Sequence, residues 1–508
     1  MIRRLLVTLL GLLLLSGGFV FYWIQDANRF KPELEALIEE QTGVPVRING
    51  DLAWRLFPPL SLTARSVTAD VDGVAWTVGY LALDLDVMTI IQTRDVDRWR
   101  IQSLTLNDVT MADDSGRLDV HALTVSNFAV GAAAPVTASL IYTPVGSEPI
   151  PLELTALVAY QTNPTLISIA DANFSSTAAA GVCNLEATPT DRGAPGPAPM
   201  PKAGDLIPVE IWRSYDWHGQ CDFEQLNGAD YRFEDATVVL ANNGGSGENV
   251  LRLPEFFGGN ATVTLAIDAR RDPILWKVTP DLQEVDSQRL MAWLDQRLQW
   301  IAPLAFAGTL ELEGNTTDEL IASLSGETSF DGGHGAISIA KIKQPLLAIA
   351  TLLQEPDKIS SWPDVWDYER FVGNWRIDKQ HHIVEFALDN LTVLADGDYD
   401  ARNDDLDILA ELTFETLPEG RMFEVNPLLM DLPIPVRCRG ALESPNCGID
   451  EKAAQRLVAS MLTSREGSAM REKLDQKIEE KVPEEYRDAA RSFLDLLGGV
   501  LENSENQD

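Results

Sequence analysis

The chain has 508 residues and a formal net charge of −37, from 77 acidic and 40 basic residues. Such a charge repels the phosphate backbone and excludes nucleic-acid binding as a main function, and it disfavours docking on anionic lipid through charge alone. The length exceeds what one ordinary core needs, which predicts two or more domains or one elongated body.

The N-terminal segment predicts a membrane anchor. Residues 5–24 contain no charge, and twenty helical residues can cross a hydrocarbon core of about 30 Å. Arg3 and Arg4 precede them, which places residues 1–4 in the cytoplasm and the rest of the chain beyond the membrane. A cleaved signal peptide is the alternative, but the apolar stretch is long and no A-x-A-like site follows it. We expect an uncleaved, single-pass anchor.

A helix is expected directly after this anchor. Residues 30–43 carry apolar side chains at helical spacing, with Pro32 in the first turn and Gly43 at the C-terminal stop. After Gly43 the apolar period changes to two. Breaks at residues 50–51, 58–59 and 72–73 divide this region into short strands.

Alternation of apolar and polar residues continues through most of the chain, for example at residues 81–87, 263–267 and 384–388. Each such strand has one apolar and one polar face, as expected for an antiparallel sheet. Helical spacing interrupts the pattern at residues 286–300 and 345–353. The sequence therefore predicts a mainly β fold with a few helices.

Two further features concern connections and cross-links. Residues 188–208 are rich in Pro, Gly and Ala, which predicts a linker. An even number of cysteines in an exported chain favours disulfides. The four cysteines form two natural pairs, Cys183 with Cys221 and Cys438 with Cys447.

The C-terminal segment, residues 451–508, changes to a helical, highly charged and acidic pattern. We interpret it as helices that cap the sheet. Contact with a membrane surface is the alternative, which the excess of acids over bases disfavours.

A search for catalytic or metal-binding patterns finds none. No pair among the five histidines has metal-ligand spacing, and the adjacent His381 and His382 would point to opposite faces of a strand. The acidic residues 395–407 lack the glycine and glutamate positions of a calcium loop, so a turn between strands explains them better. We therefore expect no enzyme activity, no cofactor and no catalytic or metal-binding residue.

The stretch GVPVRINGDLAWRLFPPLSLTARSVT, residues 43–68, resembles the opening of the AsmA family. Further segments follow in that family's order: residues 206–212 and 258–273 resemble its middle strands, and residues 324–339 and 437–450 resemble later motifs. The linker, the cysteine pairs and the acidic C-terminal segment depart from the family pattern. The residues that occupy the opening pattern are Gly43, Val46, Ile48, Gly50, Leu52, Trp54, Phe57, Pro58 and Leu60.

The resemblance implies a protein of the bacterial inner membrane with its bulk in the periplasm, built around an elongated, curved antiparallel sheet that forms an apolar groove. It predicts a partner that is phospholipid, with the inner membrane and outer-membrane components as further partners. The expected domains are a cytoplasmic N-terminus (1–4), an anchor (5–24), two AsmA-like β domains (25–187 and 209–450) joined by the linker (188–208), and the helical segment (451–508).

Three functions remain open at this point. The first is phospholipid-tail binding that supports lipid transport and outer-membrane homeostasis, for which the apolar strand faces would line an open groove. The second is a structural or assembly role in outer-membrane protein biogenesis, for which those faces would close on one another. The third is a hydrolase, which would require a buried cluster of titratable groups in a pocket.

Overall fold

The computed structural model describes residues 26–55, 60–71, 74–86, 100–112, 116–146, 148–162, 164–190, 204–228, 231–294, 299–343, 346–347, 356–416, 420–425, 429–442 and 444–450. The expected anchor at residues 5–24 and the expected helices at 451–508 lie outside these ranges. Within them, no helix is long and apolar enough to cross a membrane. Strands predominate and their neighbours run antiparallel, which confirms the mainly β, antiparallel fold.

Contacts divide the chain into two compact units. Unit 1 comprises residues 1–251 and 266–274, and unit 2 comprises residues 252–265 and 275–508. The strands β13 (Ser246–Phe256) and β14 (Gly259–Asp268) contribute residues to both. The domain limits expected from the sequence stay a prediction, and most of the expected linker lies outside the described residues.

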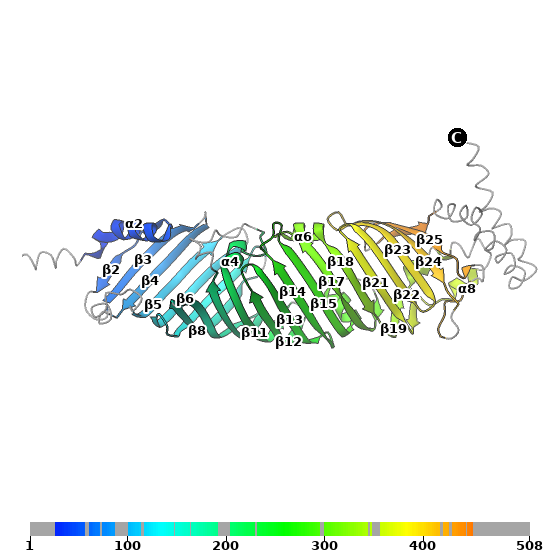
Figure 1. The fold of residues 1–508 in the computed structure, drawn as a ribbon, viewed down its shortest axis with the longest axis horizontal. Coiled ribbons are helices and arrows are strands. Elements are labelled where there is room, and N and C mark those ends of the chain that lie inside the picture. The colour runs from blue at the N-terminus through cyan, green and yellow to red at the C-terminus, as the bar shows by residue number, and fades with distance from the viewer. Residues whose placement is uncertain are drawn as a thin grey trace, which may run out of the picture. The chain divides into compact units, whose positions relative to one another are not determined.

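Unit 1 begins with a helical pair followed by strands that lie side by side in chain order (Figure 1). A short helix, α4 (Val209–Ser214), precedes β11. The remaining elements are η1 (Ala27–Phe30), α2 (Lys31–Thr42), β1 (Val46–Ile48), β2 (Leu52–Arg55), β3 (Leu60–Val71), β4 (Val74–Leu85), β5 (Arg100–Ala112), β6 (Gly116–Ala129), β7 (Ala134–Pro144), β8 (Ile150–Thr162), β9 (Thr165–Ser176), β10 (Ala179–Pro189), β11 (Tyr215–Asn227) and β12 (Arg232–Asn242).

Unit 2 contains a main sheet and a second, three-stranded sheet. The second sheet consists of β16 (Trp300–Ile301), β19 (Gly335–Ser338) and β20 (Val365–Tyr368). The main-sheet strands are β15 (Leu275–Asp286), β17 (Pro303–Glu313), β18 (Ser325–Asp331), β21 (Phe371–Asp378), β22 (His381–Leu388), β23 (Leu391–Asp400), β24 (Asp405–Phe414), β25 (Ile434–Gly440) and β26 (Asn446–Ile449). The helices are α5 (Ser287–Trp293), α6 (Thr317–Ser323) and α8 (Pro356–Ser360).

Local sequence signals placed the first elements correctly. The helix α2 ends before Gly43, which adopts φ 72° in the left-handed region that glycine tolerates. The predicted breaks at residues 50–51, 58–59 and 72–73 separate β1, β2, β3 and β4. Residues 401–404 form the predicted turn between β23 and β24.

One strand prediction was wrong, and one predicted helix is shorter than expected. Residues 206–212 were expected as a strand, but α4 begins at Val209 after the extended Pro208, and β11 starts only at Tyr215. The helix expected at 286–300 is present as α5, and Asp286 caps its start by accepting from the N–H groups of Gln288 and Arg289. It ends at Trp293, and the chain is in β16 by residue 300. The helix expected at 345–353 lies mostly outside the described residues.

Candidate functional site

The main candidate site is an apolar face of the unit 1 sheet. Strand register places apolar residues directly opposite one another from β2 to β12, and residues that are directly opposite share a face. We call this set the central row. It consists of Leu52, Ala64, Leu81, Leu106, Leu123, Ala138, Leu154, Phe174, Gly181, Phe223 and Ala236.

Two more apolar rows flank the central row. The leucine row consists of Leu62, Leu83, Leu104, Val125, Val136 and Ala156. The valine row consists of Ile48, Val67, Val78, Val109, Val120, Leu140 and Leu152. On β7 the three rows occur at Val136, Ala138 and Leu140, which are two residues apart, so all three rows lie on one face.

The opposite face of the same strands is polar. The residues next to the central row form a mainly threonine row, so most of these strands present a hydroxyl on one side and an aliphatic group on the other. At the usual spacing of about 4.8 Å, the strands from β3 to β12 give an apolar face roughly 40 Å wide. The threonine row consists of Thr63, Ala82, Thr105, Thr124, Thr137, Thr155 and Asn173.

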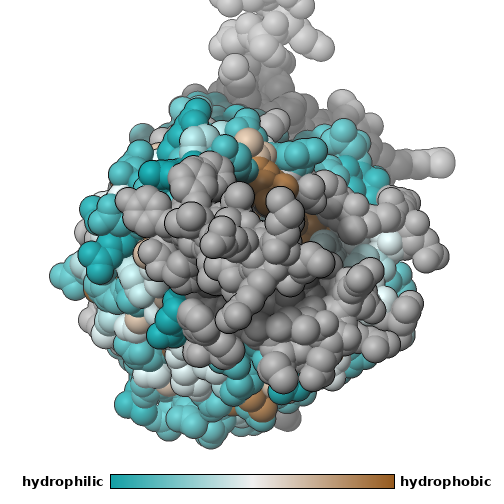
Figure 2. All heavy atoms as spheres, turned by 90° about the vertical axis from the view of Figure 1, so that its left-hand side faces the viewer, coloured by the Kyte–Doolittle hydropathy of each residue, from teal (hydrophilic) through white to brown (hydrophobic). Residues whose placement is uncertain are grey.

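The apolar face of unit 1 is only half covered. Among the described residues from 60 to 206, Val109 is the one buried apolar side chain larger than alanine. Leu81, Leu106, Leu123 and Leu154 are all partly exposed. Figure 2, viewed from the side that carries α2 and β2, shows mainly hydrophilic residues, with hydrophobic ones visible in only a few places. A face packed against a second layer would bury these leucines.

The main sheet of unit 2 has the same kind of face, but part of it is buried. Phe371, Leu388, Leu391 and Phe414 lie opposite one another on β21 to β24, and all four are buried. Side chains from the second sheet lie against this region, as described below. One chain therefore contains both an uncovered and a covered apolar face.

The residues of the opening motif join the helical segment to the first strands. Ile48 is 7% exposed and belongs to a small core with Ala27, Leu52 and Ala64, against which Trp54 packs. The Trp54 ring lies 5.0 Å from the ring of Phe30, between centroids.

Two more motif residues, Gly43 and Gly50, shape the backbone. Gly43 ends α2, and at Gly50 a Cβ would lie 2.6 Å from the carbonyl oxygen of Arg65. Val46 and Leu60 are the first residues of β1 and β3. Phe57 and Pro58 lie outside the described residues.

Hydrogen bonds fix α2 and η1 against the strands. The Ile48 N–H donates to Glu35 Oε1 at 2.7 Å, and the Leu52 N–H donates to Asn28 Oδ1 at 3.0 Å. Arg47 also pairs with Glu35 at 3.2 Å. The helical segment is thereby held at the first edge of the apolar face, at the strands where the valine and central rows begin.

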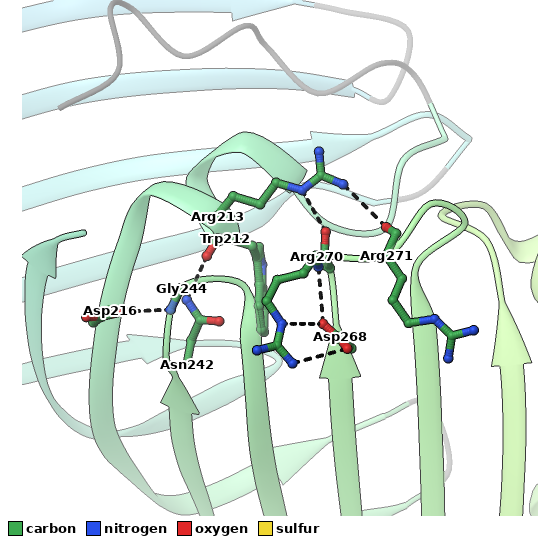
Figure 3. Close-up of polar contacts among 9 residues, drawn as sticks. Trp212, Arg213, Asp216, Asn242, Gly244, Asp268, Arg270 and Arg271 are labelled. Carbon is green, nitrogen blue, oxygen red and sulfur yellow. Dashed lines mark hydrogen bonds and ion pairs between the residues drawn. The ribbon is translucent and has the colours of Figure 1, made fainter. Parts of the chain in front are cut away.

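A second set of polar contacts lies at α4, within unit 1 and directly before β11 (Figure 3). Arg213 donates from Nε to the Ala269 carbonyl at 2.6 Å and from Nη2 to the Arg271 carbonyl at 3.3 Å. The buried Asn242 side chain donates to the carbonyls of Trp212 and Tyr215 at 2.8 and 2.6 Å. These bonds fix the start of β11.

The adjoining turns are held by carboxylates. Asp216 accepts from the N–H of Gly244 at 2.6 Å, and Arg270 pairs with Asp268 at 2.8 Å (Figure 3). The hydrogen bond and charge of Arg270 lower the pKa of Asp268. The donors and carboxylates of this cluster are engaged by the protein, while the buried Asn242 Oδ1 has no hydrogen-bond partner among the described residues; the cluster serves the fold.

Both predicted cysteine pairs come together. The sulfur atoms of Cys183 and Cys221 are 2.10 Å apart across β10 and β11, and those of Cys438 and Cys447 are 2.09 Å apart across β25 and β26. Cys183 lies opposite Ala172 on β9, so the first disulfide joins strands at the apolar face. It links β10 to β11, whose connection contains the predicted linker.

The titratable groups give little support to a hydrolase. A hollow of about 400 Å³ in unit 1 is lined in part by Glu186, Asp216 and His218. His218 Nε2 lies 3.2 Å from Glu186 Oε2, but these side chains are 75% and 52% exposed. A pair this open to solvent is not an enclosed site for general acid–base catalysis.

The adjacent histidines point to opposite faces, as predicted: His381 is exposed and His382 is buried. Burial lowers the pKa of His382, and His381 acts in the same direction. The neutral His382 ring accepts at Nδ1 from Trp375 Nε1 at 3.2 Å. Among the described residues, no group of three or more His, Cys, Asp or Glu side chains could hold a metal ion.

The sequence did not reveal the rows or the residues that keep them on one face. The sequence signal for these residues is an Asp or Ser within an otherwise alternating strand, at a point where successive apolar residues are three positions apart instead of two. Ser66 and Asp108 have this position and adopt φ 50° and 53°.

Comparison with known proteins gives one match. Residues 2–137 match the model of the AsmA family. This region includes α2, the strands β1 to β6 and the start of β7. No curated protein matches the chain, and no solved structure matches it.

Proposed function

We propose that this chain, whose residues 2–137 match the model of the AsmA family, binds phospholipid tails on the apolar face of unit 1 and supports lipid transport and outer-membrane homeostasis. In this proposal residues 5–24 anchor the protein in the inner membrane and the bulk of the chain lies in the periplasm. The activity needs no catalytic group and no cofactor.

One observation carries the proposal: the three apolar rows cross many strands, and their leucines from β3 onward stay partly exposed, whereas Leu52 at the first edge is buried. Exposed aliphatic surface is unfavourable by about 0.8 kcal/mol per CH₂ group relative to burial. An acyl chain laid on this face would remove both its own methylene groups and the leucines from water. The polar threonine row on the other side of each strand stays hydrated.

A charge placed on the apolar face tests the proposal. Leu106→Glu in the central row should abolish retention of phospholipid by residues 26–508, purified from a Gram-negative host without detergent. Its melting temperature should stay close to that of the unchanged protein, because the new carboxylate remains in contact with water.

The matched control is Thr105→Glu, the neighbouring residue on the polar face, which should retain lipid. Equal lipid retention by both variants would contradict the proposal.

A structural or assembly role remains the second candidate, because the covered part of unit 2 is the closed packing that a scaffold requires. That role predicts a protein partner and no bound lipid. Under it, Leu106→Glu should leave the function of the protein in the cell unchanged.

A further inference from the structure

Unit 2 contains its own apolar cover. The side chains that form it come from the second sheet and the segments beside it, and all are buried. Trp300 packs against Phe330 and Phe371 of the main sheet, with centroids 5.9 and 5.2 Å apart, and Trp362 packs 6.1 Å from Phe414. The cover consists of Trp300, Ile337, Ile339, Ile359, Trp362, Trp366 and Tyr368.

Buried hydrogen bonds hold this cover in place. Trp366 Nε1 donates to Asp389 Oδ2 at 2.7 Å, and Asp389 Oδ1 accepts from the N–H groups of Glu369 and Arg370 at 2.9 and 3.1 Å. Asp389 is only 7% exposed. Removing the cover would leave Asp389 Oδ2 without its donor Trp366, and a buried charged group that loses a partner is unfavourable.

A second set of bonds closes the other end of the cover. Trp300 Nε1 donates to the Tyr368 hydroxyl at 2.7 Å, and that hydroxyl donates to the Gly332 carbonyl at 3.2 Å. Ser287 Oγ donates to the Trp300 carbonyl at 2.8 Å and accepts from the Ala302 N–H at 2.9 Å. The cover is thus a fixed layer of the fold and differs from a lid that opens.

Resting on the proposed function, we propose that acyl chains bind along the three apolar rows of unit 1 and are excluded from the covered part of unit 2. Both faces are apolar, with phenylalanines among the leucines in unit 2. In unit 2 the cover occupies the surface that an acyl chain would need. Because the cover belongs to the same polypeptide, it competes with lipid for this surface at a high effective concentration. The lipid-binding region therefore has a defined end within the protein.

Photo-crosslinking of the full chain tests this boundary. Photo-leucine is incorporated in place of leucine, and the protein is reconstituted in bilayers of phosphatidylethanolamine and phosphatidylglycerol and irradiated. Lipid adducts are then located by peptide mass spectrometry. Photo-leucine changes the side chain little, so the buried positions of unit 2 should keep their packing, which an unchanged melting temperature would verify.

Adducts should appear at Leu104, Leu106, Leu123 and Leu154 and be absent at Leu388, Leu391 and Leu412. Adducts of equal frequency in both groups would overturn the boundary but leave the proposed function standing. An absence of adducts in both groups would overturn the proposed function itself, and the boundary with it.

Discussion

Ser66 in β3 and Asp108 in β5 adopt φ 50° and 53°, a region that is unfavourable for most residues but tolerated by short polar ones. Each lies where a strand shifts its apolar residues from one parity to the other, as between Ala64 and Val67. Without such a step, strict alternation would turn the valine row to the polar face. Single polar residues within strands thus keep the apolar face continuous.

Gly50 offers a direct test at this scale. In the variant Gly50→Ala, the new Cβ would lie 2.6 Å from the Arg65 carbonyl oxygen, so the contact between the first strands and β3 must shift. We expect the free energy of unfolding to fall by about 1–3 kcal/mol. Chemical denaturation measures it.

The control for this variant is Gly448→Ala in β26, where no atom lies within 4 Å of the added Cβ. It should change stability by less than about 0.5 kcal/mol. Equal effects of the two substitutions would contradict the steric account of Gly50.

His382 predicts a pH dependence. Because burial lowers its pKa in the folded state below the reference value of 6.5, the unfolded state binds the proton more readily. Stability is then fully present above pH 6.5 and falls as the pH is lowered below that value.

The variant His382→Asn should lack this component, since its amide oxygen can still accept from Trp375 and does not titrate. Urea unfolding at several pH values measures the difference between the two proteins. A difference that does not change with pH would contradict the assignment.

At the scale of elements, the sequence predicted α2, the breaks between β1 and β4, and the turn between β23 and β24, because glycine, proline and aspartate act locally. It did not predict α4, whose position depends on bonds from Arg213 and Asn242 to distant residues. Nor could alternation distinguish an uncovered strand from a covered one. The pattern at residues 81–85 resembles that at 384–388, yet Leu83 is partly exposed and Leu388 is buried.

This contrast between units predicts opposite effects of one kind of substitution. Leu412 is 4% exposed in the covered part of unit 2, so Leu412→Glu would bury a carboxylate without a partner. We expect a loss of about 3 kcal/mol or more and a clear fall in melting temperature. Leu106→Glu in unit 1 should show neither. If Leu412→Glu and Leu106→Glu lowered the melting temperature equally, the apolar cover of unit 2 would not explain how the two units tolerate a charge.

The two disulfides should differ in their contributions. In the chain-entropy model, the Cys183–Cys221 link, with a sequence separation of 38, stabilises by about 4 kcal/mol, and the Cys438–Cys447 link, with a separation of 9, by about 2.5 kcal/mol. Paired Cys→Ser variants, compared by denaturant unfolding, should follow this order. The reverse order would show that local packing outweighs loop length.

At the scale of the whole molecule, one alternating pattern serves two purposes. In unit 2 the chain supplies its own apolar layer, so that part is a closed core. In unit 1 the leucines of the three rows remain partly exposed from β3 onward. The match to the AsmA family covers residues 2–137, which is the region where this uncovered face begins. We infer that unit 1 carries the function and that the covered part of unit 2 limits it.

The most direct test of this account is native mass spectrometry of residues 26–508, purified from a Gram-negative host without detergent. The account predicts phospholipid bound to the unchanged protein and absent from Leu106→Glu, with both proteins folded. A protein that carries no lipid, and takes up none from phospholipid vesicles, would contradict the central claim.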